Sequence, residues 1–259
     1  MNNLNKKYLK YYFDFLWTMT EKELKARYKH TVFGFLWVVV NPLLQMIVIG
    51  FVFRLFIKEP IANYYAYLFS GLLVWNFFSL SLTKATPSIV YERSLIKKAK
   101  FPNAVIPLSI ILSNAVNLII ALFLLGIPTA VVGLLTIWRL PQLIASLILL
   151  ICFTCGLSLL TSALNVRYRD VSFFVQALLI IWFYATPIVY SISVIPYNLM
   201  WFWRMNPMTS IIQLYQYIFA DAAPPGLGML TINLVIMSFI SMLGFWVFHK
   251  ENKYFDDWV

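Results

Sequence analysis

Acidic residues and histidines, the side chains that could move protons or hold a metal ion, are scarce in this sequence. Ten acids and two histidines occur in 259 residues. All of them fall outside the long apolar runs, at Asp14, Glu21, Glu23, Glu59, Glu92, Asp170, Asp221, Glu251, Asp256, Asp257, His30 and His249. Proton-driven carriers place titratable groups within the membrane, and acyl or glycosyl transfer needs a general acid, a general base or a metal. The pattern disfavours a proton-coupled carrier, an enzyme and a metal site, whereas sodium coupling through backbone carbonyls stays open.

The two cysteines form a C-x-x-C motif, which in a soluble protein can mark redox or metal chemistry. Cys152 and Cys155 lie in the apolar run LLICFTCGLSLL, with no histidine or basic residue nearby to activate a thiolate. We therefore interpret them as small residues at a helix-packing surface. The sequence also lacks the G-x-x-x-x-G-K-[ST] phosphate loop. We therefore expect that this chain does not hydrolyse ATP by that route. We also expect the chain to be a passive conduit that a partner protein drives.

The composition is that of an integral membrane protein. Hydrophobic residues make up 61% of the chain and charged residues 12%, whereas a soluble domain is about one quarter charged. The mean hydropathy is +0.79. A net charge of +10 could suggest nucleic-acid binding, but positive charge beside apolar spans usually records membrane orientation. We expect a membrane-embedded chain with no nucleic-acid partner.

Six apolar runs are long enough for a helix to cross a hydrocarbon core of about 30 Å, which takes about 20 residues. They cover approximately residues 32–57, 64–85, 106–134, 142–164, 171–190 and 228–248. Prolines stand in or at the ends of these runs, at Pro42, Pro87, Pro128 and Pro187, where neighbouring helices can satisfy the freed carbonyls. The predicted fold class is an all-α integral membrane protein with six transmembrane helices.

The segment before the first run has a different pattern. Within residues 5–31, apolar and charged side chains recur every three to four positions, which gives one apolar and one charged helical face. Such a helix is expected to lie along the membrane surface. We therefore divide the chain into a cytoplasmic amphipathic interface helix at residues 1–31 and a transmembrane domain at residues 32–259. An ordinary solvated helix is the alternative, which Tyr11, Phe15 and Trp17 disfavour.

The positions of lysine and arginine set the orientation of the predicted spans. Sixteen of the twenty basic residues fall in the N-terminal tail, in the loops near residues 84–107 and 167–170, and in the C-terminal tail. The other four are Arg54, Lys58, Arg139 and Arg204. Because loops rich in lysine and arginine stay in the cytoplasm, we expect both termini to be cytoplasmic. An even number of spans agrees with this.

The stretch Lys84–Pro107 is the one long interior segment that carries a cluster of charge. A polar loop between two spans must lie in water or against another protein, since unsatisfied backbone is excluded from hydrocarbon. We predict a short helix at Tyr91–Phe101, ended by Pro102, that docks on a cytoplasmic partner. In the alternative, its lysines only fix the membrane topology. The second loop, Arg167–Asp170, would be a smaller contact or would pair within itself.

Residues 191–227 are too apolar for a free loop, and Pro196 and Pro207 divide them into pieces too short to cross a membrane. We predict two short re-entrant helices that dip into the outer leaflet and are buried in protein. Trp201 and Trp203 suit the level of the membrane interface. A plain surface loop is the alternative.

Ordered motifs along nearly the whole chain resemble one transporter family. They are EKELKARYKHTVFGFLWVVVNPLLQ (21–45), FSGLLVWNFF (69–78), ERSLIKKAKFP (92–102), LNVRYRDV (164–171), TPIVY (186–190) and NPMTSIIQLYQ (206–216). The chain resembles the permease subunits of ABC-2 type exporters. More narrowly, it is similar to the polysaccharide branch, which exports O-antigen, capsule or teichoic acid.

The resemblance implies a homodimer in the bacterial cytoplasmic (inner) membrane, paired with two nucleotide-binding subunits that hold ATP and magnesium. It implies no cofactor on this chain. The substrate would be a lipid-linked polysaccharide, O-antigen-like and carried on undecaprenyl diphosphate. A permease for teichoic acid, capsule, a drug or a lipid is the nearest alternative. A sodium-coupled carrier and a membrane-bound enzyme of polysaccharide assembly are the more distant ones.

Four groups of candidate site residues result. Contacts with the ATPase are expected at Tyr91, Glu92, Arg93, Leu95, Lys97, Lys98, Phe101, Arg167, Arg169 and Asp170. The lipid diphosphate would lie near Arg27, Tyr28 and Lys29, unless these residues only fix topology. Because aromatic faces stack on sugar rings, path candidates are Trp37, Trp75, Phe77, Phe78, Trp182 and Tyr184, unless these pack against lipid or other helices. The outer gate implied by the resemblance contains Pro187, Tyr190, Pro196, Trp201, Trp203 and Pro207.

Overall fold

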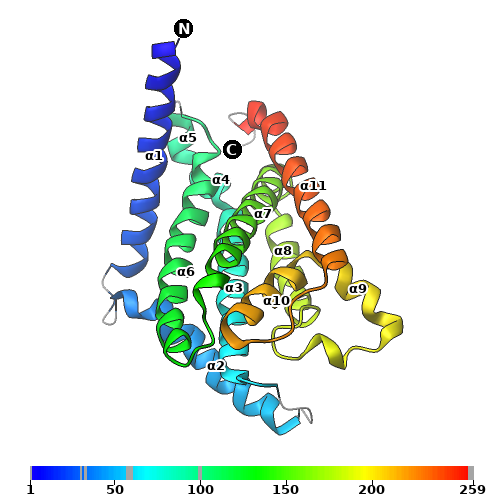
Figure 1. The fold of residues 1–259 in the computed structure, drawn as a ribbon. Coiled ribbons are helices and arrows are strands. Elements are labelled where there is room, and N and C mark those ends of the chain that lie inside the picture. Colours follow the sequence, from blue (N-terminus) through cyan, green and yellow to red (C-terminus); the bar gives the residue numbers. More distant parts are fainter. Residues whose placement is uncertain (1, 30, 32–33, 57–60, 99–100, 256–259) are drawn as a thin grey trace.

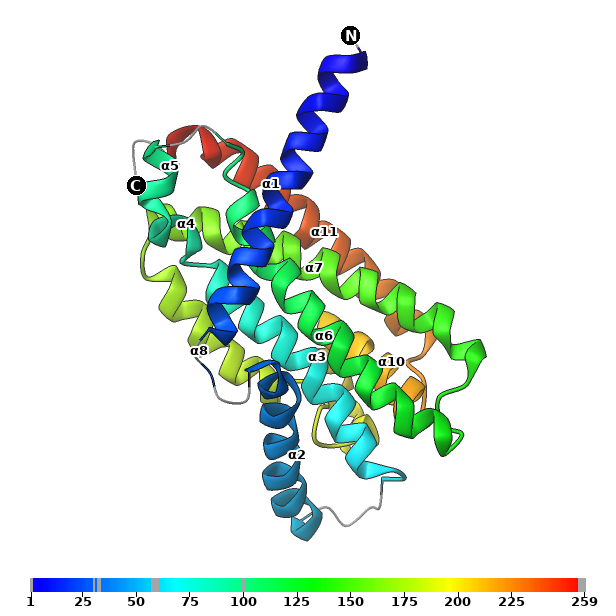
Figure 2. The same cartoon turned by 90° about the vertical axis from the view of Figure 1, so that its left-hand side faces the viewer.

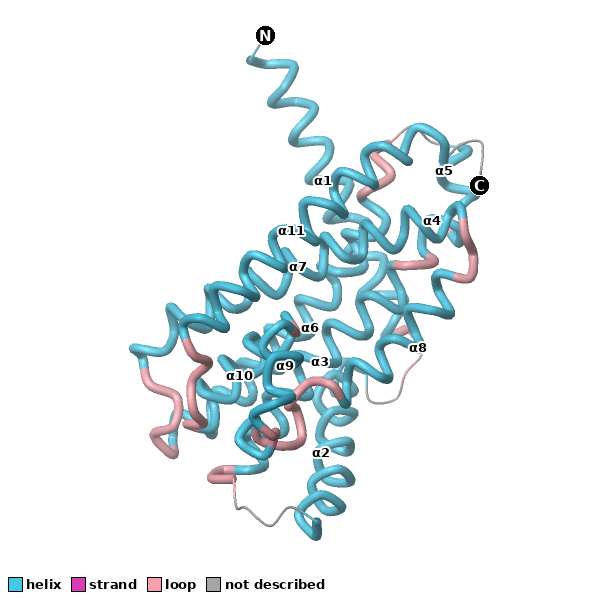
Figure 3. Tube along the Cα trace, turned by 90° about the vertical axis from the view of Figure 1, so that its right-hand side faces the viewer, coloured by secondary structure: helices cyan, strands magenta, loops and turns pink. Residues whose placement is uncertain are grey.

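The computed structural model describes residues 2–29, 31, 34–56, 61–98 and 101–255, with the backbone alone for residues 2–9, 35 and 54–56. This part of the chain consists of helices and loops, in agreement with the predicted all-α class (Figure 3). The α-helices are α1 (Asn2–Tyr28), α2 (Trp37–Phe56), α3 (Tyr64–Ala85), α4 (Ser88–Tyr91), α5 (Arg93–Lys98), α6 (Val105–Val131), α7 (Leu140–Arg167), α8 (Val171–Tyr184), α9 (Met200–Met205), α10 (Pro207–Ala220) and α11 (Leu227–Glu251). Short 3₁₀ turns cover Gly34–Leu36, Ile137–Arg139, Ile192–Val194, Tyr197–Leu199 and Asn252–Tyr254.

Helix α3 runs through the centre of the bundle. Helices α2, α6, α7 and α10 pack around it, and Leu68, Val74 and Phe78 on α3 are fully buried. In its most apolar stretch 72% of the residues are buried, against 17% for the segment that contains α11. Helix α11 accordingly packs on α7 at the edge of the bundle (Figure 1).

Within the described residues, four helical segments are long and apolar enough to cross a membrane. They are Tyr64–Ala85, Val105–Val131, Ile137–Arg167 and Leu227–Tyr254, and they coincide with four of the six predicted runs. The other two runs, 32–57 and 171–190, contain the shorter apolar segments Trp37–Phe53 and Val171–Tyr184. That these two also cross the membrane stays a prediction.

Both shorter helices differ in length from the predicted runs, for local backbone reasons. Helix α8 ends at Tyr184, Ala185 forms a turn and residues 186–190 form bends. Pro187 has no N–H for a helix and disfavours the helical conformation of Thr186 before it. At the start of the first run, Gly34 has a φ of 48°, which glycine adopts at little cost. A 3₁₀ turn follows, and α2 begins only at Trp37.

Helix α1 forms as the periodicity predicts. It packs on α6, where Leu16 and Met19 are buried against Val105. Figure 2 shows α1 crossing α6 obliquely, with its first turns extending beyond the bundle. The same end of the molecule holds α4, α5 and the last described residues (Figure 1), and we call it the N-terminal end. That α1 lies along a membrane surface stays a prediction.

The charged loop contains the short helix predicted within Tyr91–Phe101, but α5 begins only at Arg93 and a second short helix, α4, precedes it. Residues 99–100, where the predicted helix would end, lie outside the described residues. Helices α4 and α5 are separated at Glu92, which leaves the helical conformation with φ −90° and ψ 23°. Two tertiary contacts meet at this break. Ile89 and Ile96 are buried in a cluster with residues of α6, α7 and α11, while Glu92 pairs with Lys22 of α1. Neither contact can be inferred from the local sequence.

The segment between α8 and α11 contains the two short helices that were predicted, α9 and α10. They separate at Asn206, whose side chain accepts a hydrogen bond from the N–H of Met208 and so caps α10. Pro207 occupies the first helical turn, where a missing N–H has no cost. Helix α10 is buried along most of its length, unlike a plain surface loop. Its re-entry into a membrane stays a prediction.

Candidate functional site

A cavity of about 490 Å³, whose largely apolar lining also carries polar side chains, lies among α1, α2, α3 and α6. We call it the carboxamide cavity. Its polar lining comprises Arg27, Tyr28, Thr31, Asn41, Gln45, Asn76, Ser79, Thr83, Asn114 and Asn117, and Trp37 and Phe77 add aromatic surface. Polar side chains are costly between apolar helices and tend to be retained for function. This cavity is therefore the first candidate site.

Hydrogen bonds fix several side chains of the cavity wall. Arg27 Nη2 donates to Asn114 Oδ1 at 2.6 Å, and Asn114 Nδ2 donates to Ser81 Oγ at 3.0 Å. This chain of bonds joins the end of α1 to α6 and α3. Between α2 and α3, Asn76 Nδ2 donates to Gln45 Oε1 at 2.9 Å. The guanidinium and the carboxamides of Gln45, Asn76 and Asn114 are thus held in place by contacts across four helices.

Tyr28 contributes a neutral hydroxyl to the cavity. Burial raises the pKa of Tyr28, and the neighbouring Arg27 charge opposes that shift. The phenol also hydrogen-bonds with Arg27 and Asn117. Because its pKa lies above the usual value of about 10, Tyr28 carries no charge at physiological pH and can donate as well as accept.

Two polar atoms of the wall have no hydrogen-bond partner among the described residues. They are Arg27 Nε, a donor, and Asn117 Oδ1, an acceptor. Asn117 is only 8% exposed. A buried polar group left unpaired costs about 1–3 kcal/mol. Both atoms are shielded from solvent, so they add to the cost of folding this wall and not to the surface of the cavity.

The structure brings two of the predicted groups together in this cavity. Arg27 and Tyr28 line it, with Trp37 and Phe77 of the predicted sugar path. Lys29 is exposed and does not belong to the lining. Whether these residues contact a lipid diphosphate or a sugar stays a prediction.

The remaining path aromatics lie elsewhere. Trp75 and Phe78 are buried, with ring centroids 5.7 Å apart, and Trp182 stands edge-on to Phe78 at 5.2 Å. These three rings pack in the core of the single chain, as the alternative interpretation expects. Tyr184 is 64% exposed, so its side chain is open to lipid, ligand or another chain.

The predicted ATPase contacts on α4 and α5 divide into two sets. Tyr91, Arg93, Lys97 and Lys98 are exposed at the N-terminal end, and we call them the basic loop surface. Glu92, Leu95 and Phe101 instead contact α1. The Glu92 carboxylate lies 3.0 Å from Lys22 Nζ, the Phe101 and Phe15 rings are 5.0 Å apart, and Leu95 packs in the same cluster. The inward set attaches the loop to α1.

The second predicted loop is exposed beside the first. Arg167, Arg169 and Asp170 are all exposed, and the Arg167 guanidinium lies over the Tyr168 ring at 5.4 Å. A cavity of about 410 Å³ is lined by Tyr91 and Glu92 and also by residues from the first turns of α8. The two loops are therefore neighbours on one surface.

Asn206 holds the bend after α8 against α10. Its Nδ2 donates to the Ala185 carbonyl at 3.1 Å and to Thr186 Oγ1 at 2.9 Å. Its Oδ1 accepts a hydrogen bond from Trp182 Nε1 at 2.8 Å. The predicted path residue Trp182 thus supports the region implied as an outer gate.

Most of the predicted gate residues lie in or beside this bend. Trp203 Nε1 donates to the Tyr190 hydroxyl at 2.9 Å, and the Tyr67 hydroxyl donates to the Tyr190 carbonyl at 2.9 Å. Gln216 of α10 donates to the Pro187 carbonyl at 3.0 Å, and Pro207 begins α10. By contrast, Trp201 and Pro196 are exposed. Gating itself stays a prediction.

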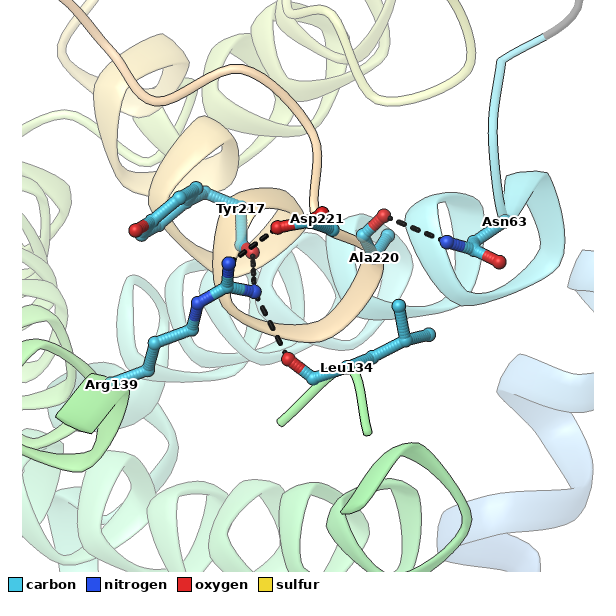
Figure 4. Close-up of polar contacts among 6 residues, drawn as sticks. All are labelled: Asn63, Leu134, Arg139, Tyr217, Ala220 and Asp221. Carbon is cyan, nitrogen blue, oxygen red and sulfur yellow. Dashed lines mark hydrogen bonds and ion pairs between the residues drawn. The ribbon is translucent and has the colours of Figure 1, made fainter. Parts of the chain in front are cut away.

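A cluster around Arg139 fixes the C-terminal end of α10 (Figure 4). Arg139 pairs with Asp221, and its Nη1 donates to the carbonyls of Leu134 and Tyr217 at 3.0 Å each. The guanidinium also lies over the Tyr217 ring at 4.4 Å. Beside this cluster, Asn63 donates to the Ala220 carbonyl at 3.2 Å. The turn between α6 and α7 and the start of α3 are thereby tied to α10.

Sequence reasoning missed the carboxamides because it searched the apolar runs only for acids and histidines. Asn114 and Asn117 are three positions apart on α6, and Asn41 and Gln45 are four apart on α2. Such spacings place side chains on one helical face. Paired carboxamides within apolar runs were therefore a usable signal. Asn206 and Arg139 carried no comparable signal, since their partners are distant in sequence.

Neither cysteine forms a disulfide. Among the described side chains, no three His, Cys, Asp or Glu residues lie close enough together to hold a metal ion.

Comparison with known proteins gives a consistent result. Residues 14–220 match the ABC-2 type transporter family. An O-antigen export system permease protein RfbA of Klebsiella pneumoniae is 35% identical over 229 residues, which cover 85% of each chain. A second from the same species is 35% identical over 222 residues, 82% of this chain and 83% of the relative. One from Myxococcus xanthus is 32% identical over 228 residues, 85% and 87% of the two chains.

Proposed function

The chain belongs to the ABC-2 type transporter family, and from that premise we propose that it is the permease of a polysaccharide exporter. It is a multi-pass protein of the bacterial cytoplasmic membrane, and an ATP-driven complex containing it moves an O-antigen-like, lipid-linked polysaccharide outward. One observation carries this proposal. Relatives described as O-antigen export permeases match more than four fifths of this chain and of their own length. The similarity is thus one of whole transmembrane subunits.

The proposed complex contains two copies of this chain and two copies of an ATPase subunit. ATP and magnesium bind to the ATPase, which docks on the basic loop surface and on the neighbouring Arg167–Asp170 loop. Exposed positive charge on two adjacent loops supports this assignment. Docking through charged groups positions a partner and speeds its association.

Helix α1 supports a mechanical role for the docking loop. Phe15 and Lys22 of α1 contact Phe101 and Glu92 of the loop, and Arg27 at the other end lines the carboxamide cavity. Twelve residues of helix separate Phe15 from Arg27, or about 18 Å at 1.5 Å per residue. Closure of the ATPases would move the loop, and α1 would carry that movement to the cavity as a rigid body.

The polar side chains of the carboxamide cavity support a substrate that carries polar groups. Its walls carry a guanidinium, five carboxamides and several hydroxyls, which match hydroxyl and phosphate groups better than hydrocarbon. Capsule and teichoic acid share the polar chemistry and are the nearest alternatives.

Co-purification from the native host tests the proposed complex. The full chain, affinity-tagged and extracted in mild detergent, should elute with an ATP-hydrolysing subunit in equal amounts. Hydrolysis by the eluted complex should depend on magnesium. A chain that elutes alone from several detergents, without ATPase activity, would contradict the proposal.

A further inference from the structure

Residues 252–255, which follow α11, fold back onto the charged loop (residues 84–107), and we call them the C-terminal segment. Phe255 is only 1% exposed, and its ring stands edge-on to that of Phe248 on α11, with the two centroids 5.4 Å apart. The same cluster contains Ile89 of α4 and Ile96 of α5. Figures 1 and 3 show α4 and α5 beside the last described residues. The C-terminal segment therefore packs against the loop that carries the basic loop surface.

A hydrogen bond joins the same two parts of the chain. Asn103, between α5 and α6, donates through its Nδ2 to Asn252 Oδ1 at 2.9 Å. Phe101 and Ala104, on either side of Asn103, pack against the cluster that contains Phe255. One apolar contact and one polar contact thus attach the loop to the C-terminal segment.

Helix α5 depends on such contacts for its position. It has six residues, and an isolated helix shorter than about 12 residues is marginal in water. On one side, Glu92 and Leu95 attach the loop to α1. On the other side, Ile96 is 6% exposed in the cluster with Phe255. The basic loop surface is therefore supported from two sides, by α1 and by the C-terminal segment.

We propose that the C-terminal segment holds the charged loop against α7 and α11, and that Phe255 is a positioning residue for the coupling of ATP hydrolysis to transport. This role rests on the proposed function, in which an ATPase docks on the loop. A loose loop would absorb the movement of a docked partner, whereas a closely packed loop passes the movement on. The cluster around Phe255 reaches Phe248 on α11 and Leu159 on α7. Movement of the loop therefore reaches these two helices as well as α1.

Hydrogen exchange tests whether the segment holds the loop. The amides of α5 are followed in the full chain, in lipid nanodiscs without the ATPase. Phe255→Ala removes the ring that packs beside Ile96, so exchange of these amides should become faster by about tenfold. Phe255→Leu still fills most of the apolar site and should stay close to the unmodified chain. Tyr254→Ala is the matched control, because Tyr254 is the adjacent aromatic residue but is 52% exposed, and it should leave the exchange unchanged.

Coupling is measured on the complex with its co-purified ATPase in proteoliposomes, as polysaccharide exported per ATP hydrolysed. Phe255→Ala should keep the ATPase, because the exposed charges of the basic loop surface are unchanged. It should lower the ratio of export to hydrolysis by about threefold or more. A simple loss of folded protein would lower export and hydrolysis together and leave this ratio unchanged. Phe255→Leu should restore the ratio, and Tyr254→Ala should not alter it.

The hydrogen bond supplies a second variant in case Phe255→Ala does not fold. Asn252→Ala removes the bond to Asn103 but keeps the apolar cluster, so it should lower the ratio by a smaller factor. Asn103→Ala should have the same effect. The double variant should be no worse than the stronger single variant, since the two residues share one interaction.

Unchanged exchange in Phe255→Ala, or an equal rise in Tyr254→Ala, would overturn the role of the segment in holding the loop. Faster exchange with an unchanged ratio of export to hydrolysis would overturn its role in coupling. If no ATPase co-purified with the unmodified chain, the proposed function would fail and the coupling role with it. The exchange measurement would still decide whether the C-terminal segment fixes α5.

Discussion

Trp37 is a residue of the candidate site, whereas Trp75 is a residue of the core, and the two should respond differently to substitution. Trp37 is 43% exposed at the cavity wall, whereas Trp75 is 5% exposed among other rings. Trp75→Ala should lower the free energy of unfolding by about 3–5 kcal/mol. Trp37→Ala should change it by less than about 1 kcal/mol and reduce polysaccharide export. Thermal unfolding and polysaccharide export, measured on the same preparations, check both variants. Unchanged export in Trp37→Ala would contradict a role of the cavity in export.

Arg139 and Asp221 form one ion pair, but we expect substitutions of the two residues to lower the stability of the protein by different amounts. Arg139 is the more buried partner and also binds two carbonyls and the Tyr217 ring. Arg139→Ala should therefore destabilise the protein by about 1.5–3 kcal/mol. Asp221→Asn should cost less, because asparagine tolerates the φ of 57° at this position. The midpoint of thermal unfolding in detergent measures both, and an equal or reversed order would contradict this account.

Among the helices, α7 and α11 approach each other at two glycines. A methyl group added at Gly244 would overlap the carbonyl oxygen of Gly156, and one added at Gly156 would overlap the backbone of Ser241. Small residues allow such close contacts in membrane proteins. Gly244→Ala should therefore force the helices apart and cost about 1–3 kcal/mol.

A control for this substitution lies on the same helix. Gly228 of α11 has no neighbour that an added methyl group would meet. Gly228→Ala should leave the unfolding midpoint unchanged or raise it slightly, because alanine favours helix. If both alanine variants unfolded at the wild-type temperature, the close packing of α7 and α11 would be incorrect.

The basic loop surface on α4 and α5 carries the most direct prediction about the motor. Arg93→Glu combined with Lys97→Glu reverses two exposed charges without touching the inward contacts of Glu92. We expect this variant to reach the membrane in normal amount but to lose the co-purifying ATPase. Quantitative immunoblotting of the eluted complex measures that loss.

Two lysines near the C-terminus provide a comparison with the same change in charge. Lys250→Glu combined with Lys253→Glu also reverses two exposed charges, on and just after α11. This variant should keep the ATPase. Retention of the ATPase by the Arg93/Lys97 variant would contradict docking and leave the loop lysines with a role in topology alone.

At this scale the sequence predicts the long helices well, because an apolar run is a local property. The run 64–85 coincides with α3, and α6, α7 and α11 differ from their predicted runs by only a few residues. The break at Glu92 could not be predicted from the local sequence, and its side chain pairs with Lys22, seventy positions earlier. The same applies to the Asn206 contacts, which join α10 to a bend twenty residues before it.

At the scale of the whole molecule, the exposed apolar side chains indicate which surfaces must contact lipid or another protein chain instead of water. Phe51 on α2, Phe174 and Ile181 on α8, and Phe239 and Met242 on α11 are all more than 60% exposed. Lipid satisfies such surfaces, and so does a second copy of the chain. We propose the homodimer because a path for a wide polymer needs more helices than one chain supplies, and twofold dimers are the commonest symmetric assembly.

The candidate site illustrates where sequence reasoning stops. Arg27 and Tyr28 could be identified from the end of an amphipathic segment, and Trp37 from its aromatic character. Their shared cavity could not, because it forms where α1, α2, α3 and α6 meet. The hydropathy pattern predicts where helices lie along the chain, but it does not predict which helix faces contact one another.

The central claim, that this chain exports a lipid-linked polysaccharide at the expense of ATP, is tested most directly in inverted membrane vesicles. Radiolabelled lipid-linked polysaccharide is added to the outside of the vesicles. The fraction of the polysaccharide that becomes protected inside the vesicles is then measured with ATP or with a non-hydrolysable analogue of ATP. We predict protection only with ATP, and only in vesicles that contain both this chain and its ATPase. The account would be contradicted if the same fraction of polysaccharide entered with the non-hydrolysable analogue as with ATP. It would also be contradicted by equal entry into vesicles that lack this chain, or by equal entry with a sodium gradient in place of ATP.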